Sequence, residues 1–347
     1  MRLRSRLTEL MRDRSMTVET LRRRAAISAE TIAALRNNTG QQVSYRALGA
    51  ICAELGVTLD QLFELIPEDI WAPIRTGREV TIHYGSRAWV ESLPGQQHGR
   101  ARDQVRQYIG VWDQRAINLI GEHLHRAGSE VYIAQEEHVT WAGRGSEPEA
   151  PKAARKAFAQ GNHVLIGSPM ANQFAEEVVC LVYDVPPHAP AMRDRFPYGF
   201  VWESHVASSF GWKSEGGELG IASTRTNTLL APRTTVLDGY GRDCALVLVH
   251  RILPRERSPG EQRRAEGERV IIAILGHTGL GTYAGAKLAI DPAWSARLYA
   301  RDPSRPLMRV VTAEYHSSPV MPPRDTRELT EWKLLDDAAE GPDALDR

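Results

Sequence analysis

Residues 17–37 read TVETLRRRAAISAETIAALRN, two short amphipathic segments joined by the junction Ala25-Ala26-Ile27-Ser28. Thr17 and Ser28 are each placed to accept a hydrogen bond from the first turn of a helix, the usual role of an N-cap residue. An acidic residue, Glu19 or Glu30, follows two positions later, where the positive end of a helix dipole favours a negative charge. The stretch therefore predicts two helices that begin abruptly and are joined by a tight turn.

Outward from this stretch, apolar residues recur at helical spacing through the first 66 residues and predict five short helices. The apolar stripes are Leu7, Leu10 and Met11; Val18, Leu21 and Ala25; Thr31, Ile32 and Leu35; Leu48, Ile51 and Leu55; and Leu59, Leu62 and Phe63. Each stripe is too narrow to hold a helix in water by itself, because short isolated helices are only marginally stable. The helices must therefore share one core.

The junction leaves space for only a short turn. The second helix is thus expected to cross the first steeply and to stand out from the surface, as in a helix-turn-helix. It is predicted to run from Ser28 to about Asn37. Asn37-Asn38-Thr39-Gly40 then ends it, since Asn and Gly tolerate the left-handed backbone of a helix C-cap.

These residues resemble those of the Cro and lambda-repressor-like helix-turn-helix family (XRE type). The resemblance rests on residues 16–21, on Ala25, Ile27, Ser28, Thr31, Ile32, Leu35 and Asn37, and on Leu48, Ala53, Leu55-Gly56-Val57, Leu59 and Leu62-Phe63. It covers roughly the first fifth of the chain, and the closing Leu-Gly-Val-x-Leu-x-x-Leu-Phe run is its most specific part. The family implies an all-α domain that binds double-stranded DNA.

The resemblance also implies which residues contact DNA. Ser28, Ala29, Glu30 and Ala33 would face the major groove, and Arg36 and Asn38 would lie near the phosphate backbone. The chemistry fits, because the Ala29 methyl can touch a thymine methyl, the Glu30 carboxylate can accept from cytosine N4, and arginine neutralises phosphate.

The charge distribution agrees with this placement. Before residue 47 there are ten arginines and four acidic residues, whereas from 47 to 70 there are five acidic residues and no basic ones. The region is basic where DNA would lie and acidic where it joins the rest of the chain. An alternative is that the arginines form only a solvated helix face.

The whole chain has 347 residues, no formal net charge and 42% hydrophobic residues, which suits two or three globular domains. Neutrality argues against coating nucleic acid along the full length. Cys52, Cys180 and Cys244 stand far apart, and neither a Cys-x-x-Cys pair nor a signal peptide is found, so a reduced cytoplasm is the expected compartment. No apolar run is long enough to suggest a membrane span.

Past residue 70 the pattern changes from helical stripes to apolar strands followed by glycine turns. Strands are predicted at 80–84, 131–133, 163–166, 178–183, 244–250, 270–275 and 308–312, and helices at 103–126, 172–177 and 282–289. A polar connection at 142–161 with a short Ala-rich helix and an exposed loop at 254–268 separate some of them. Repeated strand-turn-helix units predict a three-layer α/β domain with a mostly parallel sheet.

The predicted organisation is therefore a helix-turn-helix domain at 1–66, a linker at 67–78, an α/β domain at 79–333 and a disordered acidic tail at 334–347.

A glycine-rich segment at 276–285, GHTGLGTYAG, is the most chemically suggestive part of the second domain. Such a bend between a buried strand and a helix exposes backbone N–H groups at the positive helix end, which suits a phosphate or carboxylate. The predicted ligand-binding residues here are Gly276, His277, Thr278, Gly279, Gly281 and Thr282. The segment meets the dinucleotide pattern only in form and is not a P-loop. Equally, the glycines could serve only to let a helix and a strand pack closely.

A second turn follows the strand at 163–166 and contributes Gly167, Ser168 and Asn172 as predicted ligand-binding residues. Loops at the carboxyl ends of parallel strands converge on one crevice, so this turn, Gly85-Ser86 and the Gly276 segment are expected to line a common pocket. Ser168 is not predicted as a nucleophile, because Gly-x-Ser-x-Gly is absent.

Other polar and aromatic residues give weaker signals. The eleven histidines form no metal-binding signature, so no metal site is predicted. Trp112-Asp113, Trp202-Glu203 and Trp212-Lys213 are candidates for lining a pocket, although tryptophans more often anchor a core. No catalytic residue stands out.

Two functions remain open. In the preferred one, the protein is a transcriptional regulator whose α/β domain senses a nucleotide-like or other anionic small molecule, or holds a homodimer together. In the other, the α/β domain is a nucleotide-processing enzyme that uses the helical module for targeting. A homodimer is expected because one helix-turn-helix contacts too few phosphates and bases for useful specificity.

Overall fold

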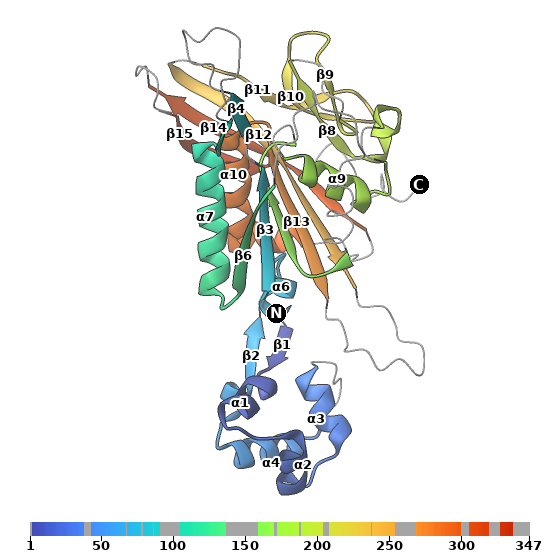
Figure 1. The fold of residues 1–347 in the computed structure, drawn as a ribbon, viewed down its shortest axis with the longest axis vertical. Coiled ribbons are helices and arrows are strands. Elements are labelled where there is room, and N and C mark those ends of the chain that lie inside the picture. The colour runs from blue at the N-terminus through green and yellow to red at the C-terminus, as the bar shows by residue number, and fades with distance from the viewer. Residues whose placement is uncertain are drawn as a thin grey trace, which may run out of the picture. The chain divides into compact units, whose positions relative to one another are not determined.

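The structure is a computed structural model of the chain, and two compact units make it up (Figure 1). It describes residues 2–37, 43–66, 68–77, 79–85, 87–90, 105–136, 159–169, 172–186, 189–203, 208–236, 238–253, 268–299, 305–318 and 327–335. The first unit comprises Met1–Glu68, and the second begins at Asp69.

The first unit contains the five predicted helices. They are α1 (Leu7–Asp13), α2 (Val18–Ala25), α3 (Ala29–Arg36), α4 (Tyr45–Leu55) and α5 (Leu59–Leu62). A strand pair that the sequence did not suggest joins the two ends of the unit, β1 (Arg2–Ser5) antiparallel to β2 (Phe63–Ile66). One core holds the helices together, and its buried members are Leu7, Leu10, Met11, Leu21, Ala25, Ile32, Leu35, Ile51, Leu55 and Leu62.

The turn between α2 and α3 is made by caps on both sides. The Thr17 and Ser28 hydroxyls accept from the backbone N–H groups of Thr20 and Thr31, each at 3.1 Å. Ala26 ends α2 in the left-handed conformation, with φ 52°. At the other end of α3, Asn37 has a φ of −91° and is not left-handed, which corrects the expected C-cap. Residues 38–40 lie outside the described residues.

A seven-stranded sheet forms the centre of the second unit, in the order β15-β14-β12-β13-β7-β3-β6. The strands are β3 (Glu79–Gly85), β6 (Glu130–Glu136), β7 (His163–Ile166), β12 (Gly239–Ile252), β13 (Arg269–Gly276), β14 (Leu307–Ser317) and β15 (Glu328–Leu334). β13, β7, β3 and β6 are parallel, whereas β12 runs antiparallel to β13 and β14, and β15 antiparallel to β14. The sheet is therefore mixed, and the prediction of a mostly parallel sheet is wrong, because apolar runs do not reveal strand direction.

Both faces of the sheet are covered, which gives the predicted three layers (Figure 1). One face packs against α6 (Ala72–Gly77), α7 (Val111–Arg126), α10 (Gly279–Ile290) and α11 (Pro292–Leu298). The other packs against α9 (Gln173–Val182) and a small sheet, β11-β10-β8-β9. The small sheet consists of β8 (Tyr198–Trp202), β9 (Gly211–Lys213), β10 (Leu219–Ser223) and β11 (Leu229–Arg233), and the 3-10 helix η2 (Pro190–Arg195) precedes it.

Two predicted elements need correction. The helix expected at 103–126 begins only at Val111, because β5 (Val105–Tyr108) pairs with β4 (Arg87–Val90) before it. The short helix and strand expected at 172–183 are one helix, α9, whose β-branched residues Val178 and Val179 are buried in the core. Core packing overrides their intrinsic strand preference. The predicted features at 142–158, 254–267 and 336–347 lie outside the described residues.

The stretch predicted as a linker, 67–78, carries apolar residues of the second core. Ile70, Trp71 and Ile74 are fully buried there. The Trp71 indole donates a hydrogen bond of 2.7 Å to the carbonyl of Ala289. The second unit therefore begins well before β3.

The Ser28 cap gives a first prediction. Ser28→Ala removes the acceptor for the Thr31 N–H and should destabilise α3 by about 1 kcal/mol. Hydrogen exchange of the α3 amides should then be about fivefold faster, as mass spectrometry can measure. Ser28→Asp keeps an acceptor and should exchange like the parent chain. Equal exchange in all three proteins would show that the cap does not stabilise the helix.

Candidate nucleic-acid interface and small-molecule site

The start of α3 presents the residues that the sequence placed at DNA. Ser28, Ala29, Glu30, Ala33 and Arg36 are all exposed, while Ile32 and Leu35 of the same helix are buried. The structure therefore leaves five of the six predicted DNA-contacting residues available to a partner. The sixth, Asn38, lies outside the described residues.

Glu30 has a defined charge state at this surface. Its pKa is lowered, first by its own backbone N–H and then by the Ser28 hydroxyl. The carboxylate is thus ionised at neutral pH and can only accept hydrogen bonds, as it would from a cytosine amino group.

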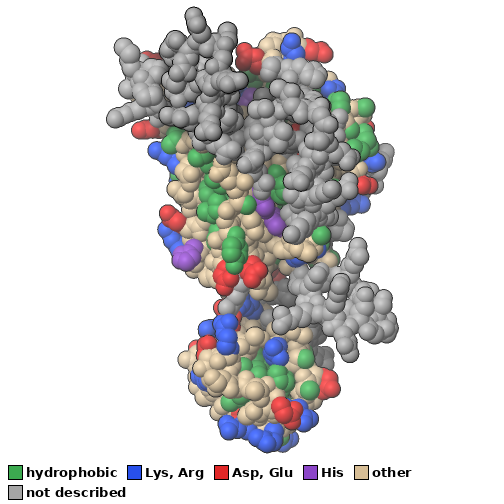
Figure 2. Space-filling view, viewed as in Figure 1, with side chains coloured by type: hydrophobic (Ala, Val, Ile, Leu, Met, Phe, Trp, Pro, Cys, Tyr) green, Lys and Arg blue, Asp and Glu red, His purple; other side chains and the backbone are tan. Residues whose placement is uncertain are grey.

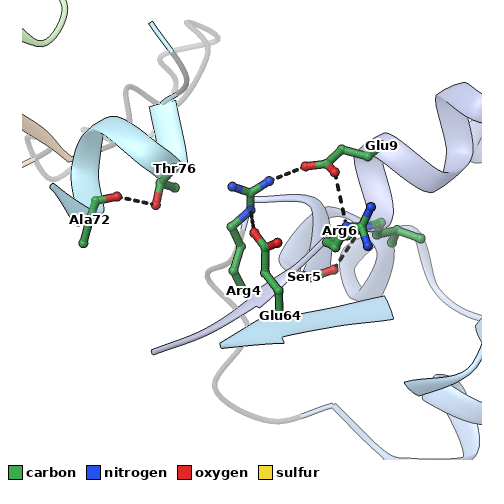
Figure 3. A network of polar contacts seen from close by, with 8 residues as sticks. Arg4, Ser5, Arg6, Glu9, Glu64, Ala72 and Thr76 are labelled. Atoms are coloured by element: carbon green, nitrogen blue, oxygen red, sulfur yellow. Dashed lines mark hydrogen bonds and ion pairs between the residues drawn. The ribbon is translucent and has the colours of Figure 1, made fainter. Parts of the chain in front are cut away.

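Some arginines of the first unit form ion pairs, and most of the others are exposed; Figure 2 shows blue side chains gathered at the end of the unit that carries α2. Arg4 pairs with Glu9 and, at 3.0 Å, with Glu64, and Arg6 pairs with Glu9 at 3.3 Å (Figure 3). This network connects β1, α1 and β2, and it leaves the Arg4 side chain only 11% exposed. Arg22 pairs with Glu19 at 2.8 Å. The exposed arginines are Arg12, Arg14, Arg22, Arg23, Arg24, Arg36 and Arg46.

A residue that sequence reasoning missed lies beside Arg46. Tyr45 is the first residue of α4, follows the N-cap Ser44, and is 90% exposed. A phenol hydroxyl at a helix start can donate to a phosphate oxygen. The signal was present in the sequence as a capped helix start followed by Tyr-Arg.

In the second unit, the two predicted ligand loops lie at neighbouring strand ends. Ile274 of β13 is paired with Ile166 of β7, which is paired with Tyr84 of β3, all in parallel. The Gly167 N–H donates to the carbonyl of Ile274 at 3.2 Å. The helix that follows β3 is α7, and the helix that follows β7 is α9. These two helices cover opposite faces of the sheet, which is where ligands bind in many α/β proteins.

A carboxylate of the chain itself, that of Asp243, occupies the start of α10. The buried Asp243 carboxylate accepts from the Gly281 N–H at 3.0 Å, from the Thr278 hydroxyl, and from the Cys244 N–H at 2.8 Å. Local sequence gives no sign of this contact, because Asp243 lies on a different strand. Binding of an external anion to these donors would require displacement of Asp243.

The glycines of this loop let the helix and the sheet approach closely. A Cβ at Gly281 would overlap the carbonyl oxygen of Cys244, and one at Gly276 would overlap the backbone of Thr278 and Thr282. Close packing therefore explains both glycines without a ligand. The assignment of Gly276, Thr278, Gly279, Gly281 and Thr282 to a ligand site stays a prediction.

The remaining predicted ligand residues have internal partners as well. The Asn172 side chain caps α9 through the Ala175 N–H at 3.0 Å and donates to the carbonyl of Ile166 at 3.2 Å. Ser168 is 4% exposed. The two loops lie together at the carboxyl ends of β7 and β13. The contacts described above hold the backbone of both loops and use polar groups that a ligand would need.

His277 is the one predicted ligand residue with an unsatisfied atom. Its Nε2 is 2.9 Å from the Val201 carbonyl oxygen, so this nitrogen carries the proton, and Nδ1 has no hydrogen-bond partner. The centre of the His277 ring lies 4.2 Å from the centre of the Trp202 ring. Burial lowers the pKa of His277, which keeps the ring neutral at pH 7.

The tryptophans of the three predicted pocket-lining pairs lie in different environments. Trp112 and Trp202 are buried in apolar clusters. Trp212 and Lys213 line a pocket on the small sheet with a volume of about 190 Å³. The pocket-lining prediction is therefore confirmed for the third pair, whereas Trp112 and Trp202 are core residues.

Several site types are absent from the described part of the chain. No group of three or more His, Cys, Asp or Glu side chains there could hold a metal ion. None of the helices described is long and apolar enough to cross a membrane. Burial raises the pKa of the Cys180 thiol to about 12 and that of Cys244 well above its ordinary value, so neither is a reactive thiolate.

Comparison with protein families identifies the first unit. Residues 6–68 match the Cro/C1-type HTH DNA-binding domain, which confirms the resemblance drawn from the sequence. No curated protein and no solved structure matches the chain. The role of the second unit must therefore be argued from its own geometry.

The close approach of α10 gives a second prediction. Gly281→Ala places a methyl group against the Cys244 carbonyl and should destabilise the second unit by about 1–3 kcal/mol. Gly121→Ala, in the middle of α7 with nothing within 4 Å, should be neutral or stabilising. All eight tryptophans lie after residue 70, so denaturant unfolding followed by tryptophan fluorescence reports this unit. Equal midpoints for the two variants would contradict the packing argument.

A third prediction concerns pH. The folded chain holds His277 neutral with its pKa below the ordinary 6.5, so the unfolded chain binds the proton first as the pH falls. The contribution of neutral His277 to stability is fully present above pH 6.5, and it is lost as the pH falls from there through the pKa of His277 in the folded chain. His277→Gln keeps a donor for Val201 and should reduce the slope of stability against pH between about pH 5 and 7.5, measured by thermal unfolding. The remaining slope comes from groups such as His123 and His250, whose pKa burial also lowers. His125→Gln, at an exposed position on α7, should leave the slope unchanged.

Proposed function

With a Cro/C1-type HTH DNA-binding domain at residues 6–68, we propose that this protein is a transcriptional regulator that reads an operator through α3. The observation that carries the proposal is the capped, exposed start of α3. Ser28, Ala29, Glu30 and Ala33 are free to meet base edges, and Arg36 is exposed at the far end of the same helix.

The exposed arginines support the proposal because they supply phosphate contacts. Arg23, Arg24, Arg36 and Arg46 carry positive charge on α2, α3 and α4, whereas Arg22 is paired with Glu19, and Arg4 and Arg6 are paired with Glu9 and Glu64. Phosphate contacts fix the register of a protein on the duplex, and base contacts supply specificity. We include Tyr45 among the phosphate contacts.

We propose that the second unit senses a small molecule and that the protein acts as a homodimer. The pocket beside Trp212 supports the sensing role. Dimerisation follows from the small contact area of one module, since two modules on a two-fold operator double the number of base and phosphate contacts.

The test begins by selecting DNA sites from a random library with the full-length protein. The dissociation constant for the selected site is then measured at salt concentrations between about 50 and 200 mM. Arg36→Ala should weaken binding to all sequences and reduce the slope of log affinity against log salt by about one, because one phosphate contact is lost.

Arg126→Ala is the matched control. It removes one positive charge from an exposed helix of the second unit, where Arg126 pairs with Glu122. It should leave both affinity and salt slope unchanged. If no site is enriched, or if Arg36→Ala and Arg126→Ala behave alike, α3 is not the reading helix.

A further inference from the structure

The small sheet of the second unit has a pocket on the face turned away from the large sheet. Phe200, Trp202, Ile221 and Ala231 point inward to the core, while their neighbours Val201 and Ala222 line the pocket. Side chains alternate between the faces of a strand, so two buried apolar side chains form the floor of an outward-facing cavity. Its volume is about 190 Å³.

One wall of the pocket is held rigidly. A Cβ at Gly199 would lie 2.5 Å from Cζ3 of Trp212, so the absent side chain is what lets this indole approach β8 closely. The Arg193 guanidinium lies 5.0 Å from the centre of the Trp212 ring. This cation–π contact places the guanidinium of η2 at the pocket.

The rest of the lining carries both signs of charge. Arg193 supplies a half-buried cation, and the exposed residues Glu215 and Glu218 supply two carboxylates. Lys213 pairs with Trp202, so strand alternation places its side chain on the opposite face from Trp212. Among the described residues, none of the Arg193, Glu215 and Glu218 side chains forms an ion pair. Opposite charges that line one small cavity without neutralising each other fit a ligand that itself carries both signs.

We propose that this pocket binds a free amino acid with an apolar side chain, and that this amino acid is the effector of the regulator proposed above. The apolar side chain would lie on Val201 and Ala222 against Trp212. Arg193 would take the carboxylate, and Glu215 and Glu218 the ammonium group.

The size of the cavity supports this class of ligand. A volume of about 190 Å³ lies below the 300 Å³ or more typical of sites for drug-sized molecules. An amino acid matches this space, whereas much of a nucleotide would lie outside it. The proposal therefore replaces a nucleotide-like effector with a smaller zwitterion.

Calorimetric titration of the full-length protein tests the proposal without DNA. The probes are L-valine, L-leucine, L-methionine and L-phenylalanine, together with the leucine analogues 4-methylpentanoate, which lacks the ammonium group, and 3-methylbutylamine, which lacks the carboxylate. At least one amino acid should bind, and each analogue should bind at least about tenfold more weakly than leucine or not at all. No binding by any of the four amino acids, or equal binding by an analogue, would overturn the proposal.

Two matched variants locate the site. Arg193→Gln should weaken binding by about tenfold, because it removes the guanidinium from the wall. Arg195→Gln, on the same 3-10 helix but outside the pocket lining, should bind like the parent chain. Equal affinities for the two variants would place the amino acid elsewhere and reject the site.

DNA binding separates this proposal from the proposed function. The dissociation constant for the selected DNA site is measured with and without the amino acid that binds. A changed DNA affinity in the parent, absent in Arg193→Gln, supports the effector role. DNA binding without amino-acid binding rejects only the pocket, whereas amino-acid binding without DNA binding rejects the regulator.

Discussion

The large sheet of the second unit is apolar on both faces, and most of that unit follows from the need to bury both. Val247, Val249 and Ile272 pack on the helical side, while Leu246, Leu248 and Ile271 pack on the other side. A sheet with two apolar faces needs two covering layers. Here α7 and α10 provide one, and α9 with the small sheet provides the other. The pocket beside Trp212 lies on the small sheet that covers part of the second face.

Polar groups inside this packing are satisfied largely by the chain itself. Asp243 accepts the free N–H of Gly281, and Asn172 caps α9 while donating to the end of β7. Buried donors and acceptors without partners are costly, so these contacts fix the loops at the sheet edge. They also change the interpretation of the glycine loop. The start of α10 does bind a carboxylate, but this carboxylate belongs to Asp243 of β12. His277 Nδ1 is one of the buried atoms that have no hydrogen-bond partner.

The need to bury apolar surface also explains the first unit. Its helices are too short to be stable alone, and their narrow apolar stripes combine into one core. The strand pair β1 and β2 joins its two ends, and the ion pairs of Arg4 and Arg6 with Glu9 and Glu64 connect that strand pair to α1. These ion pairs divide arginines that look equivalent in the sequence. Some form ion pairs within the module, and others remain exposed.

The sequence by itself determined the features that depend on neighbours along the chain. Helix periodicity and the caps at Thr17 and Ser28 specified α1 to α5 and the tight turn, since these signals act within a few residues. Apolar runs likewise located β3, β6, β7, β12, β13 and β14. Only the tertiary structure decided what depends on distant residues: the reversed direction of β12, the continuation of α9 through Val178 and Val179, the filling of the α10 end by Asp243, and the pocket on the small sheet. Strand direction, burial and charge pairing are set by contacts between segments far apart in the chain, and no local pattern encodes them.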